Sequence, residues 1–144
     1  PLRPTTDKDT TMPRNLYVTL PVKNLDRSVD FFEALGFSFN PQFTSENGAA
    51  LVINDNTSVM LVAEAFFSTL SKVPITDPRK ATEALFSLSL DSRAEVDDLV
   101  RKAIAAGATE GHAPEDLGFM YSWAFVDLDG HQWGVFSMAA APAG

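Results

Sequence analysis

The sequence predicts an α+β fold in which one unit, a strand followed by a helix and three further strands, occurs twice. The main observation is an internal repeat. Leu16–Gly36 (LYVTLPVKNLDRSVDFFEALG) and Leu85–Gly107 (LFSLSLDSRAEVDDLVRKAIAAG) each combine an alternating apolar strand, a polar break, an amphipathic stretch and a final glycine. A spacing of roughly 70 residues is too long for a solenoid repeat and indicates a duplicated domain. The chain has 144 residues, 45% of them hydrophobic, which is enough for one shared core. A ligand site is expected where the two halves meet.

The first unit is predicted to begin with a strand at Leu16–Val22, because apolar side chains alternate along it and share one face. A helix follows, with Asn24 or Asp26 as its N-cap and Gly36 as its left-handed C-terminal cap. Three more strands are predicted at Phe37–Thr44, Ala49–Asn54 and Thr57–Ala63, the last two joined by a hairpin at Asp55-Asn56.

A connector at Glu64–Thr82, with one helical turn around Phe66–Leu70, is predicted to join the units. The second unit begins with a strand at Ala84–Leu90 and a helix whose start carries a capping box of Ser92 and Glu95. Three strand segments are then predicted at Ala108–His112, Met120–Asp127 and Gln132–Ser137, the last two joined by a hairpin at Asp129-Gly130.

These elements indicate a single domain at residues 13–138. Repeat 1 covers about 14–63, the connector 64–82 and repeat 2 about 83–138. Residues 1–12 are expected to be a flexible extension or an expression remnant, and residues 139–144 a flexible tail.

Charge and composition argue against several classes of partner. The chain has 11 basic and 19 acidic residues, a net charge of −8 that disfavours nucleic acid and would attract a cationic ligand. No apolar run approaches the ~18 residues that a membrane span needs, so no membrane partner is expected. The absence of cysteine excludes disulfides and thiolate chemistry and fits a cytoplasmic protein.

Two segments resemble the vicinal oxygen chelate superfamily, which includes glyoxalase I, bleomycin resistance proteins and extradiol dioxygenases. LPVKNLDRSVDFFEALGF, residues 20–37, is similar to the family's strand and D-L-x-x-S-x-x-F-Y-x-x-L-G-F helix. FVDLDGHQWGVF, residues 125–136, is similar to its D-P-D-G-x-x-x-E-L hairpin, with Leu128 in place of the usual proline. The resemblance covers Leu16–Ser137. It implies two βαβββ repeats whose strands form a curved mixed sheet around a cavity, within a homodimer.

The resemblance also implies four metal-ligand positions, which this sequence fills with unsuitable residues. The family's metal enzymes hold a divalent ion with His, Glu or Gln side chains, and the matching positions here are Tyr17, Leu61, Leu85 and Gly134. Leucine and glycine side chains offer no donor atom. We therefore expect no metal, no other cofactor and no catalytic residue. The two histidines, His112 and His131, are expected in ordinary surface or turn roles.

Hydrogen-bonding and aromatic side chains remain as candidates for a ligand site. The expected ligand-binding residues are Tyr17, Thr19, Leu61, Leu85, Ser87, Trp123 and Gly134. Trp123 shares one strand face with Phe119, Tyr121 and Phe125, because these aromatic residues alternate with Met120, Ser122 and Ala124. If that face lines the cavity, it is a stacking platform for a planar or cationic ligand. If it faces the helices, it is ordinary core, and the period alone leaves both options open.

Three functions are compatible with these observations. The favoured one is a metal-independent small-molecule binding protein of the glyoxalase/bleomycin resistance type that sequesters a planar or cationic compound. The alternative is a metal-dependent lyase, isomerase or extradiol dioxygenase of the same superfamily, against which the unsuitable ligand positions count heavily. The third is an accessory protein that uses the fold for partner contacts.

Overall fold

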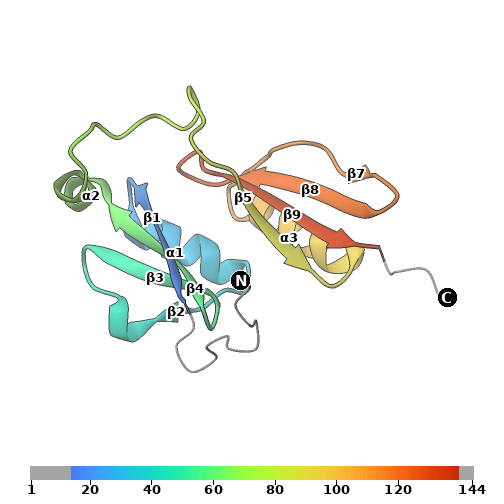
Figure 1. Cartoon of the computed structure of the whole chain (residues 1–144), viewed down its shortest axis with the longest axis horizontal. Helices are drawn as coiled ribbons and strands as arrows, with labels where there is room; N and C mark the ends of the chain where they lie inside the picture. The colour runs from blue at the N-terminus through green and yellow to red at the C-terminus, as the bar shows by residue number, and fades with distance from the viewer. Residues whose placement is uncertain (1–13, 140–144) are drawn as a thin grey trace, which may run out of the picture.

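A computed structural model of the chain describes residues 14–139. The predicted N-terminal extension, residues 1–12, and residues 140–144 of the predicted tail lie outside the described residues. Two mixed β-sheets lie beside each other, one from each half of the chain, with the connector running across one end (Figure 1). The predicted α+β fold with two similar units is confirmed.

The first unit forms a four-stranded sheet in the order β1-β4-β3-β2. Asn24, rather than Asp26, caps the helix, because its side chain accepts a hydrogen bond of 3.0 Å from the Arg27 backbone N–H. β1 and β4 are parallel, whereas the other neighbours are antiparallel. The elements are β1 (Leu16–Val22), α1 (Leu25–Ala34), β2 (Phe39–Asn40), the 3₁₀ turn η2 (Pro41–Phe43), β3 (Gly48–Asn54) and β4 (Thr57–Ala63).

The second unit forms a sheet in the order β5-β9-β8-β6, with β7 also paired to β8. The predicted capping box is present in part: the Ser92 hydroxyl accepts from the Glu95 backbone N–H as predicted, but the Glu95 carboxylate accepts from the Asp91 backbone N–H instead of that of Ser92. The elements are the connector helix α2 (Glu64–Leu70), β5 (Phe86–Leu90), α3 (Arg93–Ala105), β6 (Thr109–Glu110), β7 (Glu115–Asp116), β8 (Met120–Val126) and β9 (Gln132–Met138).

Two predicted strands are much shorter than expected. The predicted strand Phe37–Thr44 is only β2, because Pro41 has no N–H to donate and the Asn40 side chain accepts from the Gln42 backbone N–H to start a 3₁₀ turn. The predicted strand Ala108–His112 is only β6, and the chain then pairs with β8 a second time as β7. Both differences fall at sheet edges, where pairing is least constrained.

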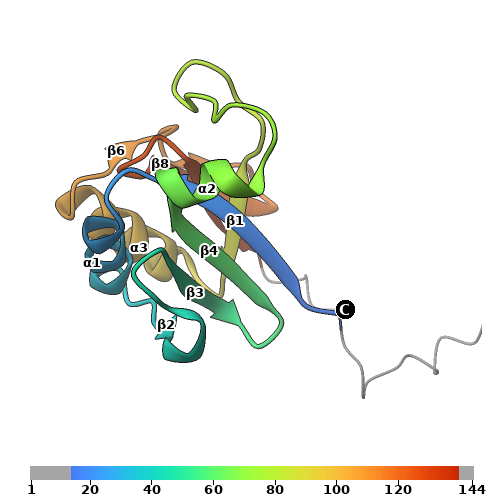
Figure 2. The ribbon, with the colours of Figure 1, turned by 90° about the vertical axis from the view of Figure 1, so that its left-hand side faces the viewer.

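One hydrophobic core joins the halves. Figure 2 shows α1 and α3 side by side, covering the same side of the molecule. Phe32 of α1 lies 5.4 Å from Trp133 of β9 between ring centroids, and Phe31 lies 6.1 Å from Phe125 of β8. The end of β1 is also fixed to the β8–β9 turn, because the Lys23 backbone N–H donates to Asp129 Oδ1 over 2.8 Å. The two sheets therefore turn their helix-covered faces inward and leave their other faces, here called the open faces, free of α1 and α3.

Candidate functional site

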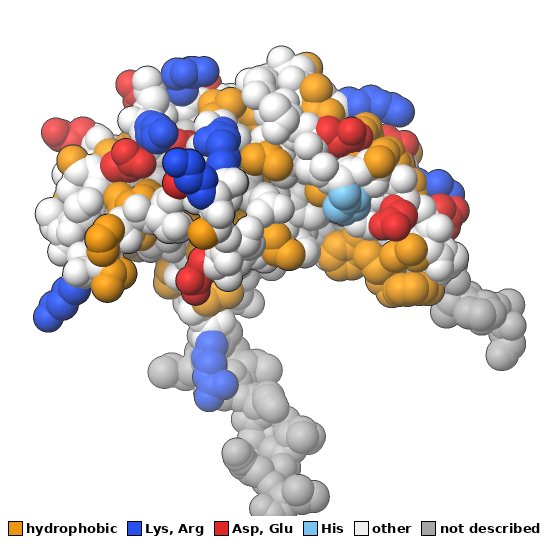
Figure 3. Space-filling model, turned by 90° about the horizontal axis from the view of Figure 1, so that it is seen from above, with side chains coloured by type: hydrophobic (Ala, Val, Ile, Leu, Met, Phe, Trp, Pro, Cys, Tyr) orange, Lys and Arg blue, Asp and Glu red, His pale blue; other side chains and the backbone are white. Residues whose placement is uncertain are grey.

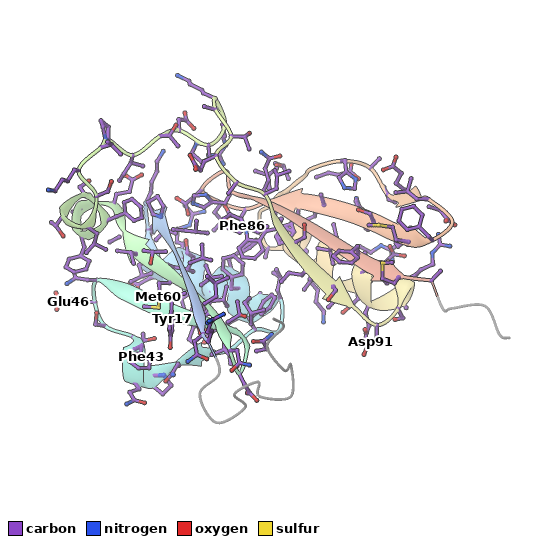
Figure 4. The ribbon with its side chains drawn as sticks, in the orientation of Figure 1. Tyr17, Phe43, Glu46, Met60, Phe86 and Asp91 are labelled. Atoms are coloured by element: carbon purple, nitrogen blue, oxygen red, sulfur yellow. The ribbon has the colours of Figure 1, made fainter. Side chains whose placement is uncertain are left out.

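The register of β1 and β4 determines which predicted residues lie on the open face of the first sheet. Tyr17 pairs with Ser58 and Thr19 pairs with Met60, and paired residues point to the same side of a sheet. Tyr17 is 56% exposed, and Thr19 is exposed as well. Figure 4 shows Tyr17 and Met60 on these neighbouring strands. The open face of this sheet therefore carries Tyr17, Thr19 and Met60.

Leu61 does not belong to this face, and its prediction as a cavity residue is wrong. Leu61 pairs with Leu20 of β1 and Ala49 of β3, and all three side chains are buried on the helix-covered face. A shift of one residue along a strand moves every side chain to the other face. Met60 takes the open-face position that the sequence analysis gave to Leu61.

The open face of the second sheet brings together three predicted residues. Ser87 of β5 pairs with Gly134 of β9. Leu85 lies two residues before Ser87, and residues two apart in an extended chain point to the same side. These three residues border a cavity of about 260 Å³, here called the open-face hollow. Gly134 leaves its floor without a side chain, and a Cβ built there would lie 3.4 Å from the Ser87 hydroxyl. The predicted grouping of Leu85, Ser87 and Gly134 therefore exists in space.

Trp123 lies on the opposite side of this sheet, and its prediction as a ligand-stacking residue is wrong. It is 8% exposed and belongs to the core, and its indole N–H donates to the Glu110 carboxylate over 2.7 Å. The Arg101 guanidinium of α3 lies 6.0 Å from its ring. Tyr121 and Phe125 are buried on the same face. Of the two readings left open by the sequence, the helix-facing one is correct.

A histidine and a serine that the sequence analysis did not assign to the site complete the open-face hollow. His112 Nδ1 lies 2.8 Å from the Ala113 carbonyl, and Nε2 lies 3.3 Å from the Ser122 hydroxyl. Because a carbonyl only accepts, the neutral ring carries its proton on Nδ1 and Nε2 accepts from Ser122. The available signal was the alternation along β8, which places Ser122 opposite the aromatic residues. His112 follows β6, a pairing that the sequence did not locate.

The groups with clearly shifted pKa values among residues 14–139 lie elsewhere. The pKa of Tyr121 is raised because its hydroxyl donates to Asp97 over 2.6 Å. Burial raises the pKa of Asp127, although the charge interaction with His131 and hydrogen bonds from Trp133 and nearby backbone amides oppose this. The backbone N–H of Gly118 and the Arg93 charge lower the pKa of Asp116. None of these three groups is among the residues that line the open-face hollow.

The side chains at the expected metal-ligand positions do not fit a divalent ion. After the register correction these positions are Tyr17, Met60, Leu85 and Gly134, which offer a phenol and a thioether but no imidazole or carboxylate. Across the described part of the chain, no three histidine or acidic side chains come close enough to hold a metal ion. No described helix is long and apolar enough to cross a membrane.

The fold and sequence resemble known proteins over most of the chain. The model of the Glyoxalase/Bleomycin resistance protein/Dioxygenase superfamily matches residues 14–135. A hypothetical protein from S. aureus, SA1046, is 29% identical, with a TM-score of 0.75 over 88% of this chain and 95% of that one. A glyoxalase/bleomycin resistance protein/dioxygenase family enzyme from Burkholderia phytofirmans PsJN is 21% identical, with a TM-score of 0.74 over 85% and 97%. A glyoxalase-related enzyme from Fulvimarina pelagi is 19% identical, with a TM-score of 0.75 over 92% and 94%. No curated protein sequence matches the chain.

Proposed function

Because the chain belongs to the glyoxalase/bleomycin resistance protein/dioxygenase superfamily, we propose that it uses this fold to bind a small molecule without a metal ion. The observation that carries the proposal is the composition of the open-face hollow. Leu85, Ser87 and Gly134 meet there beside His112 and Ser122, and the side chains at Leu85 and Gly134, two of the expected metal-ligand positions, offer no donor atom.

The lining of the hollow favours a neutral, partly apolar ligand. Apolar surface comes from Leu85, Met120 and Phe136, and hydrogen-bonding groups come from Ser87 and the His112–Ser122 pair. No carboxylate or ammonium group belongs to this lining, so the net charge of −8 does not act on a ligand at close range. With Trp123 on the helix side, the structure gives no support to the stacking platform expected for a cationic compound. We therefore propose a compact neutral compound with a few polar groups.

A larger side chain on the floor of the open-face hollow should weaken the binding of a small molecule there. Gly134→Leu places a branched side chain on the floor of the hollow, where the first added atom meets only ordinary contacts. With the neutral fluorescent probe N-phenyl-1-naphthylamine, we expect the dissociation constant to rise about tenfold or more, equivalent to at least ~1.4 kcal/mol of binding free energy. The measurement is a fluorescence titration, with the melting temperature recorded for each variant.

A control variant and a measurement of metal content complete the test of metal-free binding. Glu33→Leu adds the same side chain to an exposed position of α1 and should leave probe binding unchanged. After incubation with Zn²⁺, Ni²⁺, Mn²⁺ or Fe²⁺ and desalting, we expect fewer than about 0.1 metal ions per chain by mass spectrometry. Uptake of one ion per chain would contradict the proposal and return attention to the metal-dependent lyases, isomerases and dioxygenases of the superfamily.

We also propose that the ligand site is completed by a second copy of the chain. β1 and β5 are edge strands of their sheets. Exposed apolar side chains lie on β1, directly before β5 and at the far end of the second sheet, namely Leu16, Tyr17, Leu85, Leu117, Phe119 and Met138. Figure 3 shows hydrophobic side chains gathered near the described C-terminal end. A homodimer that covers these surfaces would place Tyr17 and Thr19 of one copy over the open-face hollow of the other.

Sedimentation velocity tests this assembly. We expect the unmodified protein to sediment as a dimer, and Phe119→Asp to shift it to a monomer because a carboxylate would be buried without a partner. Ile104→Asp is the matched control, since Ile104 is 39% exposed on α3, on the helix-covered side and away from β1 and the open faces. A monomer in the unmodified protein at tens of micromolar, or equal dissociation of both variants, would contradict the dimer proposal while leaving the binding proposal to its own test.

A further inference from the structure

A second cavity lies between the two halves of the chain, beneath the connector. It has a volume of about 310 Å³ and is here called the connector hollow. Its walls come from the C-terminal half of β1, from α2, from residues 71–84, and from the starts of β5 and β9. Figure 4 shows Phe86 at the junction between the two sheets, where β5 begins. The lining is mainly apolar and includes Pro21, Phe67, Ile75 and Phe86. Cavities of this size hold small organic molecules in other proteins.

His131 supplies a polar group to the lining of this mainly apolar cavity. The residue is more than nine-tenths buried, at 8% exposure, and it lines the hollow. Its Nε2 lies 2.9 Å from the Pro21 carbonyl, which can only accept a hydrogen bond. In its neutral form the ring therefore carries its proton on Nε2, and Nδ1 is left as an acceptor.

No residue within 14–139 forms a hydrogen bond with this Nδ1 atom. Over the same residues, no buried side-chain nitrogen or oxygen lacks a partner, so Nδ1 must border open space rather than packed atoms. The open spaces that His131 lines are the connector hollow and an adjoining shallower depression beside Lys23 and Asp129. An acceptor at the edge of an apolar cavity selects molecules that bring a donor to it.

We propose that the connector hollow is a second binding site, separate from the open-face hollow, for a compact and mainly apolar molecule with one hydrogen-bond donor. The donor, such as a phenol O–H or an indole N–H, bonds to His131 Nδ1, while Phe67 and Phe86 contact the apolar body of the molecule. Polar atoms at Thr19 and Thr82 border the same space, and Glu83 is the acidic residue of the lining. An apolar molecule without a donor leaves Nδ1 unpaired and loses affinity for that reason.

The connector that closes this cavity is attached to the second half by few polar contacts. The Arg79 guanidinium donates to the Leu128 carbonyl over 3.2 Å, and the Gln132 amide donates to the Thr82 hydroxyl over 3.2 Å. Both bonds are exposed to solvent, where a single hydrogen bond adds about 1 kcal/mol or less. Local opening of the connector therefore gives a small molecule access to the cavity without unfolding the core.

Indole and indene form a matched pair of probes, because they have similar size and shape and only indole carries an N–H donor. We expect indole to bind with a dissociation constant on the order of 1 mM or tighter, and indene to bind about tenfold more weakly. The measurement is an NMR titration that follows the imidazole nitrogens of His131. Indole should move the Nδ1 resonance and leave the Nε2 bond to Pro21 in place.

Ala84→Leu tests the location, because Ala84 is an exposed residue of the hollow's lining and a larger side chain there occupies the cavity without entering the core. It should weaken indole binding at least fivefold, while the exposed control Glu33→Leu should not. Equal affinities for indole and indene, or an unchanged affinity in Ala84→Leu, would overturn the proposal. Indole binding that is weakened by Gly134→Leu instead would place the probe in the open-face hollow, which also overturns this proposal but supports the proposed function.

Discussion

Trp133→Ala should lower the free energy of unfolding by about 3–5 kcal/mol, the range found when a large buried aromatic side chain is removed. Trp133 is 1% exposed, and its ring lies 5.4 Å from Phe32, 5.3 Å from Phe86 and 6.2 Å from Phe125 between centroids. Phe32 belongs to the first half of the chain and the other rings to the second. The substitution therefore removes contacts that hold the halves together, and leaves the Asp127 carboxylate without its 2.9 Å bond from the indole N–H. Equilibrium urea denaturation measures the loss.

Trp133→Phe keeps an aromatic ring in the core but removes the indole N–H that donates to Asp127. The loss of unfolding free energy in this variant should depend on pH. Burial raises the pKa of Asp127, whereas the Trp133 N–H stabilises its charged form and lowers that pKa. A carboxyl whose pKa is raised on folding stabilises the protein at low pH, and this contribution is lost as the pH rises through the folded pKa. Without the indole donor the pKa rises further. Trp133→Phe should therefore cost more at pH 7 than at pH 4, and an equal cost at both would contradict the role given to this bond.

The large elements of the fold could be predicted because their signals are local. Leu16–Val22 alternates, Asn24 caps the helix that follows, and Gly36 adopts a φ of 102° at the end of that helix, as a left-handed cap requires. The short edge strands could not be predicted in the same way. β2 and β7 have two residues each and exist because a neighbouring strand offers partners. Such pairing depends on tertiary contacts that no local pattern encodes.

The candidate site was predicted in part, for a related reason. Alternation shows which residues share a strand face, so Leu85, Ser87 and Gly134 could be grouped once β5 and β9 were recognised. Alternation does not show which face the helices cover, and this is why Trp123 was assigned to a possible platform while its ring packs beneath Arg101. His112 was missed because its approach to the site depends on an edge pairing of β6.

Because Leu61 lies in the core and Met60 on the open face, alanine substitutions at these two positions should have very different effects on stability. Leu61→Ala should lower the free energy of unfolding by about 2–5 kcal/mol, because Leu61 is fully buried and its removal leaves a cavity in the core. Met60→Ala should cost less than about 1 kcal/mol, since Met60 is only partly buried on the open face and leaves room that solvent can fill. The two neighbours therefore form an internal control for the register of β4.

For probe binding, the order of the two effects should be reversed: Met60→Ala should have the larger effect and Leu61→Ala the smaller. Met60 lies beside Thr19 on the face that is proposed to close over the open-face hollow of a second copy. Met60→Ala should therefore reduce the binding free energy of N-phenyl-1-naphthylamine by more than it reduces the free energy of unfolding. Leu61→Ala, at a urea concentration where the protein stays folded, should leave the probe affinity within about twofold of the original, because the side chain faces α1 across the core. If Leu61→Ala instead spares stability and weakens the probe, the pairing of Thr19 with Met60 is wrong and Leu61 returns to the cavity face. That result would also move the expected second ligand position back to leucine, which offers a divalent ion no donor atom.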